Sequence, residues 1–256
     1  MTTTTRAAVA LAGALALAVG VGGCSTDEQA ATTTAASASS STTAASASSS
    51  TTAASASSSS AAARILEKAR SNALSARSGA FTGEVQQGKE KMQISFKGTS
   101  DGKTADVAIA MGTRGKVRLI AVGGGIYMQA DETFWKNQKA PASVQKAGDK
   151  FVKAPASAAS LTSSLNLTAF LKEAFGAVTA SKLSDVVTSA SVGGVDCWVL
   201  TDKQGARNGA LYVSKRAYEL VRFTGSPSSP GQLDFSRWNQ DVGVTAPPAS
   251  QIITIR

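Results

Sequence analysis

Histidine is absent from this 256-residue chain, and its absence narrows the chemistry that we expect of the protein. Imidazole is the usual general base for serine and cysteine nucleophiles and the commonest transition-metal ligand. The carboxylates that remain as candidates, Asp131, Glu132, Asp196 and Asp202, lie in predicted turns, where a solvated side chain is the ordinary explanation. Serine and threonine are too abundant for any one to be singled out as a nucleophile. We therefore expect no enzyme activity, no metal site and no cofactor.

Cysteine is nearly absent as well, since the chain has only Cys24 and Cys197. If Cys24 is chemically modified, Cys197 has no partner for an intramolecular disulfide, and we expect a small buried apolar residue there. Long apolar runs are missing too. The longest is about 17 residues and is interrupted by glycine, which is shorter than the ~20 residues that span a bilayer.

Residues 1–23 have the composition of an export signal. Arg6 precedes an apolar run over residues 7–21, and two small residues, Gly22 and Gly23, stand before Cys24. The string Val21-Gly22-Gly23-Cys24 resembles the lipobox of bacterial lipoproteins. That resemblance implies cleavage before Cys24, a diacylglyceryl group on its thiol and an acyl chain such as palmitate on its amino group. The alternative is an uncleaved membrane anchor, although no cluster of Lys or Arg follows the run.

Two or more acyl chains hold a protein stably on a bilayer. We therefore expect a lipid-anchored protein at the extracytoplasmic face of the cell membrane. Residues 24–61 form a predicted tether in which the nonad TTAASASSS occurs three times, beginning at Thr33, Thr42 and Thr51. A segment without large apolar side chains cannot offset its ordering entropy, so we expect a disordered coil spanning roughly 30–40 Å.

The excess of positive charge, +9, is spread along the chain rather than collected in one run. A nucleic-acid groove needs basic residues interleaved with aromatic ones, and aromatic residues make up only 5% of the sequence. We therefore expect no nucleic-acid partner. An anionic membrane surface attracts basic side chains by roughly 1 kcal/mol each.

Residues 62–256 form one predicted domain, which is long enough for a substantial core. An amphipathic helix begins it, with Ile65, Leu66, Ala69, Ala73 and Leu74 on one face and Gly79 as its stop. A second apolar stripe covers residues 166–178, with Asn166 or Thr168 as its N-cap. Between and after the helices, short alternating runs predict antiparallel strands. These lie near residues 92–96, 107–111, 117–122, 126–128, 186–187, 195–200, 210–213, 218–223, 232–238 and 252–255.

Several stretches of this α+β pattern resemble the actinobacterial lipoproteins related to LprG and LppX, and more distantly the periplasmic carrier LolA. They are Ile126-Tyr127-Met128, Phe134-Trp135-Lys136, and residues 148–153, 192–200, 209–214 and 233–249. The sequence departs from the pattern at Phe151, where Trp is expected, and at Ala217-Tyr218, where Leu-Pro is commoner. The resemblance implies a strongly curved antiparallel half-barrel sheet with helices packed on its concave face. It also implies an apolar cavity between sheet and helices that takes lipid acyl chains.

The leading hypothesis is a carrier of lipid or lipidated molecules, with a lipid or glycolipid cargo and a membrane transporter or acceptor protein as partner. The candidate cavity lining is Val107, Ile109, Met111, Ile126, Met128, Phe170, Phe175 and Leu211. The alternative is a non-enzymatic envelope module for protein interaction or structure, because alternating Val and Ile with an amphipathic helix also make an ordinary filled core.

Overall fold

The computed structural model describes residues 60–154 and 166–253. The predicted signal, Cys24 and almost all of the predicted tether lie outside the described residues, as do residues 254 and 255 of the last predicted strand. At the tether's end the structure differs slightly from the prediction. Ser60 caps helix α2 (Ala61–Ser75), and its Oγ accepts a hydrogen bond from the Ala63 N–H at 3.2 Å. Serine is a favoured N-cap because its side chain satisfies a free helix N–H, so residues 60 and 61 belong to the folded domain.

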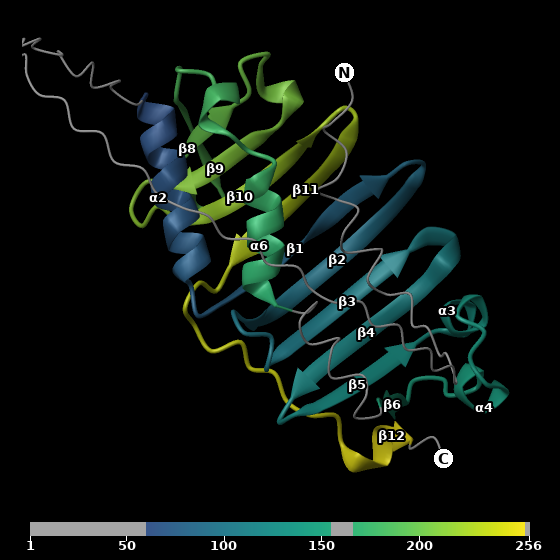
Figure 1. Cartoon of the computed structure of the whole chain (residues 1–256). Coiled ribbons are helices and arrows are strands. Elements are labelled where there is room, and N and C mark those ends of the chain that lie inside the picture. The colour runs from purple at the N-terminus through teal and green to yellow at the C-terminus, as the bar shows by residue number, and fades with distance from the viewer. Residues whose placement is uncertain (1–59, 155–165, 254–256) are drawn as a thin grey trace, which may run out of the picture. The chain divides into compact units, whose positions relative to one another are not determined.

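The described residues form one twelve-stranded sheet with helices on one face (Figure 1). The strands are β1 (Ser78–Gln87), β2 (Glu90–Thr99), β3 (Ala105–Met111), β4 (Gly115–Val122), β5 (Gly125–Ala130), β6 (Phe151–Lys153), β7 (Thr188–Val192), β8 (Val195–Thr201), β9 (Ala210–Ser214), β10 (Leu220–Ser226), β11 (Ser229–Ser236) and β12 (Ile252–Ile253). Their order is β12-β6-β5-β4-β3-β2-β1-β11-β10-β9-β8-β7. Neighbouring strands are antiparallel except β12 and β6, which are parallel.

The sheet is curved and does not close, because β7 and β12 lie at opposite ends of the strand order. Helices α2 and α6 (Leu167–Gly176) lie across the same face of it (Figure 1). The predicted α+β class, with a curved antiparallel sheet and helices packed on it, is thereby confirmed. No helix within residues 60–154 and 166–253 has the length and apolarity that crossing a bilayer requires.

The helices bury apolar residues that the sequence pattern predicts, but the end of α2 differs from the prediction. In α2 the residues Ile65, Leu66, Ala69 and Ala73 are buried, as the pattern predicts. The helix ends at Ser75, however, and not at Gly79, which lies inside β1. A Cβ at Gly79 would stand 3.1 Å from the side chain of Leu167, so this glycine permits close approach of helix to sheet rather than ending a helix.

Helix α6 begins where one of the two proposed caps predicts. The Asn166 Oδ1 accepts a hydrogen bond from the Ala169 N–H at 2.8 Å, which decides between Asn166 and Thr168. Leu167, Leu171 and Phe175 are the buried residues of the helix.

Several elements differ from the sequence prediction. Strand β1 was missed because only Phe81 and Val85 interrupt its small and polar residues. Helices α3 (Glu132–Asn137) and α4 (Ala142–Gln145) were missed because each has fewer than two turns. The strand predicted at residues 186–187 begins instead at Thr188, and Val186 is 67% exposed. Short 3-10 helices η1 (Gly112–Arg114), η3 (Ala180–Lys182), η4 (Ala206–Asn208) and η5 (Ala249–Gln251) complete the described elements.

Candidate functional site

One face of the sheet is apolar across nearly its whole width. Directly opposite residues of an antiparallel pair place their side chains on the same face, so the strand registers show which residues lie side by side. One row of such partners crosses seven strands as Val152, Met128, Leu119, Val107, Phe96, Phe81 and Phe235. A second row crosses nine strands as Ala130, Val117, Ile109, Ile94, Gly83, Leu233, Phe223, Leu211 and Leu200.

The predicted lining residues of the strands all lie on this apolar face. Val107, Ile109 and Met111 come from β3 and are 4%, 5% and 8% exposed. Ile126 and Met128 of β5 lie on the same side, and Leu211 of β9 lies at its other end. The inward direction assigned from the alternating pattern is therefore the one in the structure. Whether a cavity opens over these residues stays a prediction.

Helices α2 and α6 cover one part of the apolar face. In Figure 1 they lie in front of β1 and β8–β11, whereas no helix of the described part of the chain crosses the middle of β3–β5. The Phe170 ring of α6 stacks on Phe81 at 4.2 Å between centroids, and it lies 6.5 Å from the Phe235 ring. Of the two predicted lining residues on α6, Phe170 therefore contacts the sheet.

Phe175 lies at the contact between α6 and α2, with its ring 5.8 Å from the Arg70 guanidinium carbon. Arg70 also closes the end of α6. Its Nη2 donates hydrogen bonds to the backbone oxygens of Val178 at 2.6 Å and Phe175 at 3.2 Å. A cation at a helix C-terminus satisfies free carbonyls and stabilises the helix dipole. The same guanidinium is held by Glu67 at 2.7 Å.

Methionine is concentrated on the apolar face. Met92, Met111 and Met128 account for three of the four methionines in the chain, and Met92 lies directly opposite Met111. Unbranched thioether side chains repack easily and fit surfaces that accept varied apolar partners. The apolar face is also free of charge, because the buried polar residues among those described are only Ser78 and Ser214.

Trp135 is a core residue that the candidate lining did not include. It lies in α3, where Asp131 Oδ1 caps the helix by accepting from the Phe134 N–H at 2.8 Å. The Trp135 side chain belongs to the same apolar core as the sheet face and is 6% exposed. Its Nε1 is the only buried side-chain nitrogen or oxygen among the described residues that has no hydrogen-bond partner.

The opposite face of the sheet is polar and hollowed. The hollow has a volume of about 730 Å³ and lies over the outward side chains of β1–β5. Among them, Arg118 donates two hydrogen bonds to Asp106, at 2.9 and 2.8 Å, and these bonds raise the pKa of Arg118. Lys97 lies 3.6 Å from the same carboxylate. The hollow itself is lined by charged side chains such as Glu84, Lys116 and Arg118 together with small apolar ones such as Ala108 and Ala110.

The carboxylates considered as catalytic candidates cap a helix, have a hydrogen-bond partner or are exposed to solvent. Asp131 caps α3, and a hydrogen bond from Lys136 lowers the pKa of Glu132. Asp202 Oδ1 accepts from the Gln204 N–H at 2.8 Å in a turn, and Asp196 is exposed on β8. No three His, Cys, Asp or Glu residues in the described ranges are grouped as a metal site would require.

One string fits the Gly-x-Ser-x-Gly pattern of a nucleophile elbow, namely Gly98-Thr99-Ser100-Asp101-Gly102. Such an elbow joins a strand to a helix. Here the string lies between β2 and β3, two antiparallel strands, and Asp101 accepts hydrogen bonds from the Thr99 hydroxyl and the Lys103 N–H within the turn. It is a hairpin connection.

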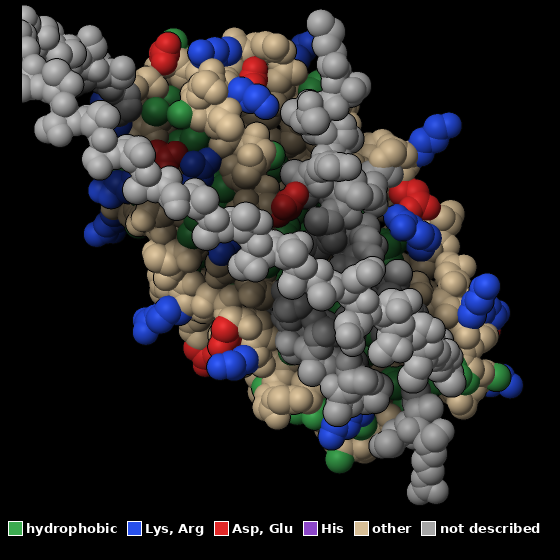
Figure 2. Space-filling view, viewed as in Figure 1, with side chains coloured by type: hydrophobic (Ala, Val, Ile, Leu, Met, Phe, Trp, Pro, Cys, Tyr) green, Lys and Arg blue, Asp and Glu red, His purple; other side chains and the backbone are tan. Residues whose placement is uncertain are grey.

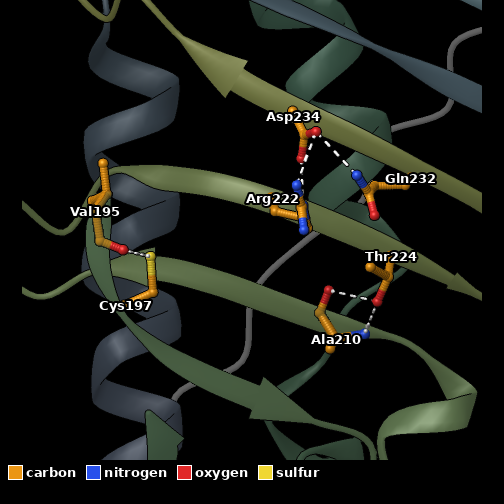
Figure 3. Close-up of polar contacts among 7 residues, drawn as sticks. All are labelled: Val195, Cys197, Ala210, Arg222, Thr224, Gln232 and Asp234. Carbon is orange, nitrogen blue, oxygen red and sulfur yellow. Dashed lines mark hydrogen bonds and ion pairs between the residues drawn. The ribbon is translucent and has the colours of Figure 1, made fainter. Parts of the chain in front are cut away.

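Cys197 is buried on β8, as the sequence predicts (Figure 3). Its Sγ lies 3.3 Å from the backbone oxygen of Val195, and burial raises the pKa of its thiol. Figure 3 also shows the polar contacts of the neighbouring strands. Arg222 is paired with Asp234, which also accepts a hydrogen bond from the Gln232 amide at 3.0 Å, and the hydrogen bond from Arg222 lowers the pKa of Asp234.

The basic side chains on the helix-bearing side lie apart from one another. Figure 2 shows them spaced around the outline of that side rather than gathered in one patch. This agrees with the scattered positions of Lys and Arg in the sequence.

Comparison with known proteins finds likenesses among solved structures. LprF from Mycobacterium bovis superposes with a TM-score of 0.46 at 11% identity, over 73% of this chain and 96% of that one. The lipoprotein LppX from Mycobacterium tuberculosis gives a TM-score of 0.43 at 13% identity, over 72% and 98%. An uncharacterized conserved protein from Thermus thermophilus gives 0.34 at 12%, over 75% and 98%.

No protein-family model and no curated protein matches the chain. LppX is one of the proteins that the sequence resemblance named. At these identities and TM-scores no residue role passes from those proteins to this chain, and the function is argued below from the chain's own residues.

Proposed function

We propose that this protein is a membrane-anchored envelope lipoprotein that binds the acyl chains of a lipid or lipidated molecule on the apolar face of its sheet. The observation that carries the proposal is the extent of that face. Two rows of apolar partners run across seven and nine strands, whereas α2 and α6 cover only one part of the face (Figure 1). The part on β3–β5, which no helix of the described residues crosses, is rich in Met, Ile and Val, and its inward side chains are buried.

The affinity for an acyl chain comes from apolar burial alone. Each buried CH₂ contributes about 0.8 kcal/mol, so a chain of about 15 such groups gains roughly 12 kcal/mol before the costs of ordering it are subtracted. Binding of this kind involves no bond making or breaking. The protein therefore acts as a carrier, not as an enzyme, and it needs no cofactor.

Reversible binding requires an element that opens at modest cost, and α6 fits that role. It has ten residues, and the described contacts that hold it include the Phe170 stack on Phe81 and the Arg70 bonds to its last carbonyls. An isolated helix of this length is marginal in water, so α6 depends on these contacts. Loss of a few of them exposes the apolar face to a membrane or an acceptor.

The anchor belongs to the same proposal. Acyl chains on Cys24 hold the domain at the extracytoplasmic face of the cell membrane, where lipid cargo is at hand. A membrane transporter or an acceptor protein then supplies or receives the cargo.

The proposal is tested with two tryptophan substitutions on adjacent residues of β3. Ile109 faces the apolar side and Ala110 the polar side, so Ile109→Trp occupies the proposed lipid position and Ala110→Trp does not. The assay is uptake of a radiolabelled phospholipid from vesicles by the full chain. We expect Ile109→Trp to lower uptake at least tenfold and Ala110→Trp to leave it within twofold. Equal uptake by both variants contradicts binding on the apolar face.

A second candidate function, protein interaction, is favoured by one edge of the sheet. Strand β7 ends the strand order, four of its five residues are exposed, and none is charged. The two exposed large apolar residues of the described chain, Val186 and Val195, lie at this same edge. Edge strands that are neither charged nor covered accept an extended segment of a partner protein as an added strand. Ala190→Lys places a charge in the middle of β7 and is expected to abolish capture of envelope proteins if this edge is the binding surface.

A further inference from the structure

The unpaired indole N–H of Trp135 is a polar group within an otherwise apolar core. Trp135 shares the core with the sheet face, and among the residues described its Nε1 alone is buried without an acceptor. The neighbouring packing is close. The Trp135 and Phe134 rings meet edge to face at 5.6 Å, and a Cβ at Gly115 would stand 2.6 Å from the Phe134 nitrogen. The helix that holds Trp135 is thereby fixed against β4.

A buried donor without an acceptor costs folding free energy, and native structures keep few of them. Tryptophan is also a costly choice where only bulk is needed, because phenylalanine fills space without a donor. Both the unpaired donor and the choice of tryptophan over phenylalanine are explained if the indole N–H finds its acceptor in a bound ligand. Acyl chains themselves offer no acceptor, but the ester or amide that joins a chain to its headgroup offers a carbonyl oxygen.

We propose that the Trp135 Nε1–H donates a hydrogen bond to the carbonyl oxygen of an acyl ester or amide in the bound cargo. The inference rests on the proposed function and narrows its cargo to acylated molecules, as opposed to ethers or plain hydrocarbons. The hydrogen bond fixes the position of the acyl chain along the apolar face. The headgroup is then expected near α3, which lies where β4 begins and β5 ends (Figure 1).

The chain contains a matched control in Trp238. Its Nε1 already donates to the backbone oxygen of Leu220 at 2.9 Å, so it has no donor to offer a ligand. Trp135→Phe and Trp238→Phe therefore make the same chemical change, and only the first removes an unsatisfied donor. In the ligand-free state we expect Trp238→Phe to lower the melting temperature and Trp135→Phe to lower it less, because only the former breaks a hydrogen bond.

The experiment compares two probes that differ only in the carbonyl. Full-length chain is titrated with vesicles of dioleoyl phosphatidylcholine and with vesicles of its dioleyl ether analogue. We expect the wild type and Trp238→Phe to bind the ester about tenfold more tightly than the ether, which equals about 1.4 kcal/mol. We expect Trp135→Phe to bind the ester and the ether with the same affinity, which equals the affinity of the wild type for the ether.

Each outcome bears on the inference. Equal binding of ester and ether by the wild type overturns the role of Trp135 and leaves the proposed function standing. Absence of binding to either probe overturns both. If Trp135→Phe fails to fold, replacement of Trp135 by benzothienylalanine, which puts sulfur in place of the N–H in a ring of the same shape, repeats the comparison. A tenfold ester preference that survives that replacement also overturns the inference.

Discussion

The Phe170 ring gives a quantitative test of how α6 is held on the sheet. Phe170 stacks on Phe81 at 4.2 Å with 17° between the planes, and it meets Phe235 at 6.5 Å and 38°. Aromatic pairs contribute about 0.5–1.5 kcal/mol each beyond their buried area. Truncation of a fully buried Phe to Ala costs about 3–5 kcal/mol, and Phe170 is only half-buried. We therefore expect Phe170→Ala to lower the free energy of unfolding by about 2–3 kcal/mol.

Two further variants separate the contributions. Phe170→Leu keeps most of the apolar volume and loses the ring pairs, so we expect a loss of about 1 kcal/mol. Lys172→Ala changes an exposed residue of the same helix and is expected to have an effect within about 0.5 kcal/mol. The assay is urea denaturation followed by circular dichroism, with the m-value compared between variants.

The same variants test whether α6 acts as a lid. If α6 opens to admit an acyl chain, Phe170→Ala speeds lipid uptake from vesicles even as it destabilises the fold. A free energy of unfolding within about 0.5 kcal/mol of the wild type for Phe170→Ala refutes the reasoning on packing. Slower uptake, with the loss of stability observed, refutes the lid.

The remaining predictions concern four other sites. Arg70→Ala should raise the amide hydrogen exchange of the last turn of α6 and leave α2 protected, because Arg70 caps the α6 carbonyls. In the folded chain the Arg222 hydrogen bond lowers the pKa of Asp234. The ionised Asp234 therefore stabilises the fold above its unfolded pKa of about 3.9, and this stabilisation is lost as the pH falls further. Asp234→Asn should accordingly reduce the loss of stability that the protein shows below pH 4. Cys197 should react with thiol reagents only after unfolding, since its pKa is raised by burial and the thiolate is the reactive form. Cys24→Ser should move the protein from the membrane fraction to the soluble one, and a variant that stays with the membrane contradicts the lipid anchor.

Residues with strict period-two alternation could be placed from the sequence alone. In β3 every second residue from Ala105 to Met111 is buried, because one face of the strand packs on the core and the other does not. The orientation of Val107, Ile109 and Met111 followed from that pattern. The Gly193-Gly194 turn was also predictable, since both residues adopt positive φ, 56° and 81°, between antiparallel β7 and β8.

Elements without such periodicity were missed for identifiable reasons. Gly83 occupies a core-facing position of β1, where the alternating pattern of a strand would have an apolar side chain. A Cβ there would lie 1.9 Å from the Gln232 oxygen, so the close approach of β11 leaves room only for glycine. Helix α3, which carries Trp135, was missed because it is too short to show a helical period. The one available signal was Asp131, which stands three residues before Phe134. This is the spacing between an N-cap residue and the backbone N–H whose hydrogen bond it accepts.

The measurement that tests the central claim most directly is native mass spectrometry of the protein purified from envelope membranes, with organic extraction of whatever is bound. The apolar face predicts one acylated molecule per chain, released when Ile109→Trp is introduced and retained when Ala110→Trp is introduced. A bare mass for the wild type, with no uptake of phospholipid added to it, contradicts the account.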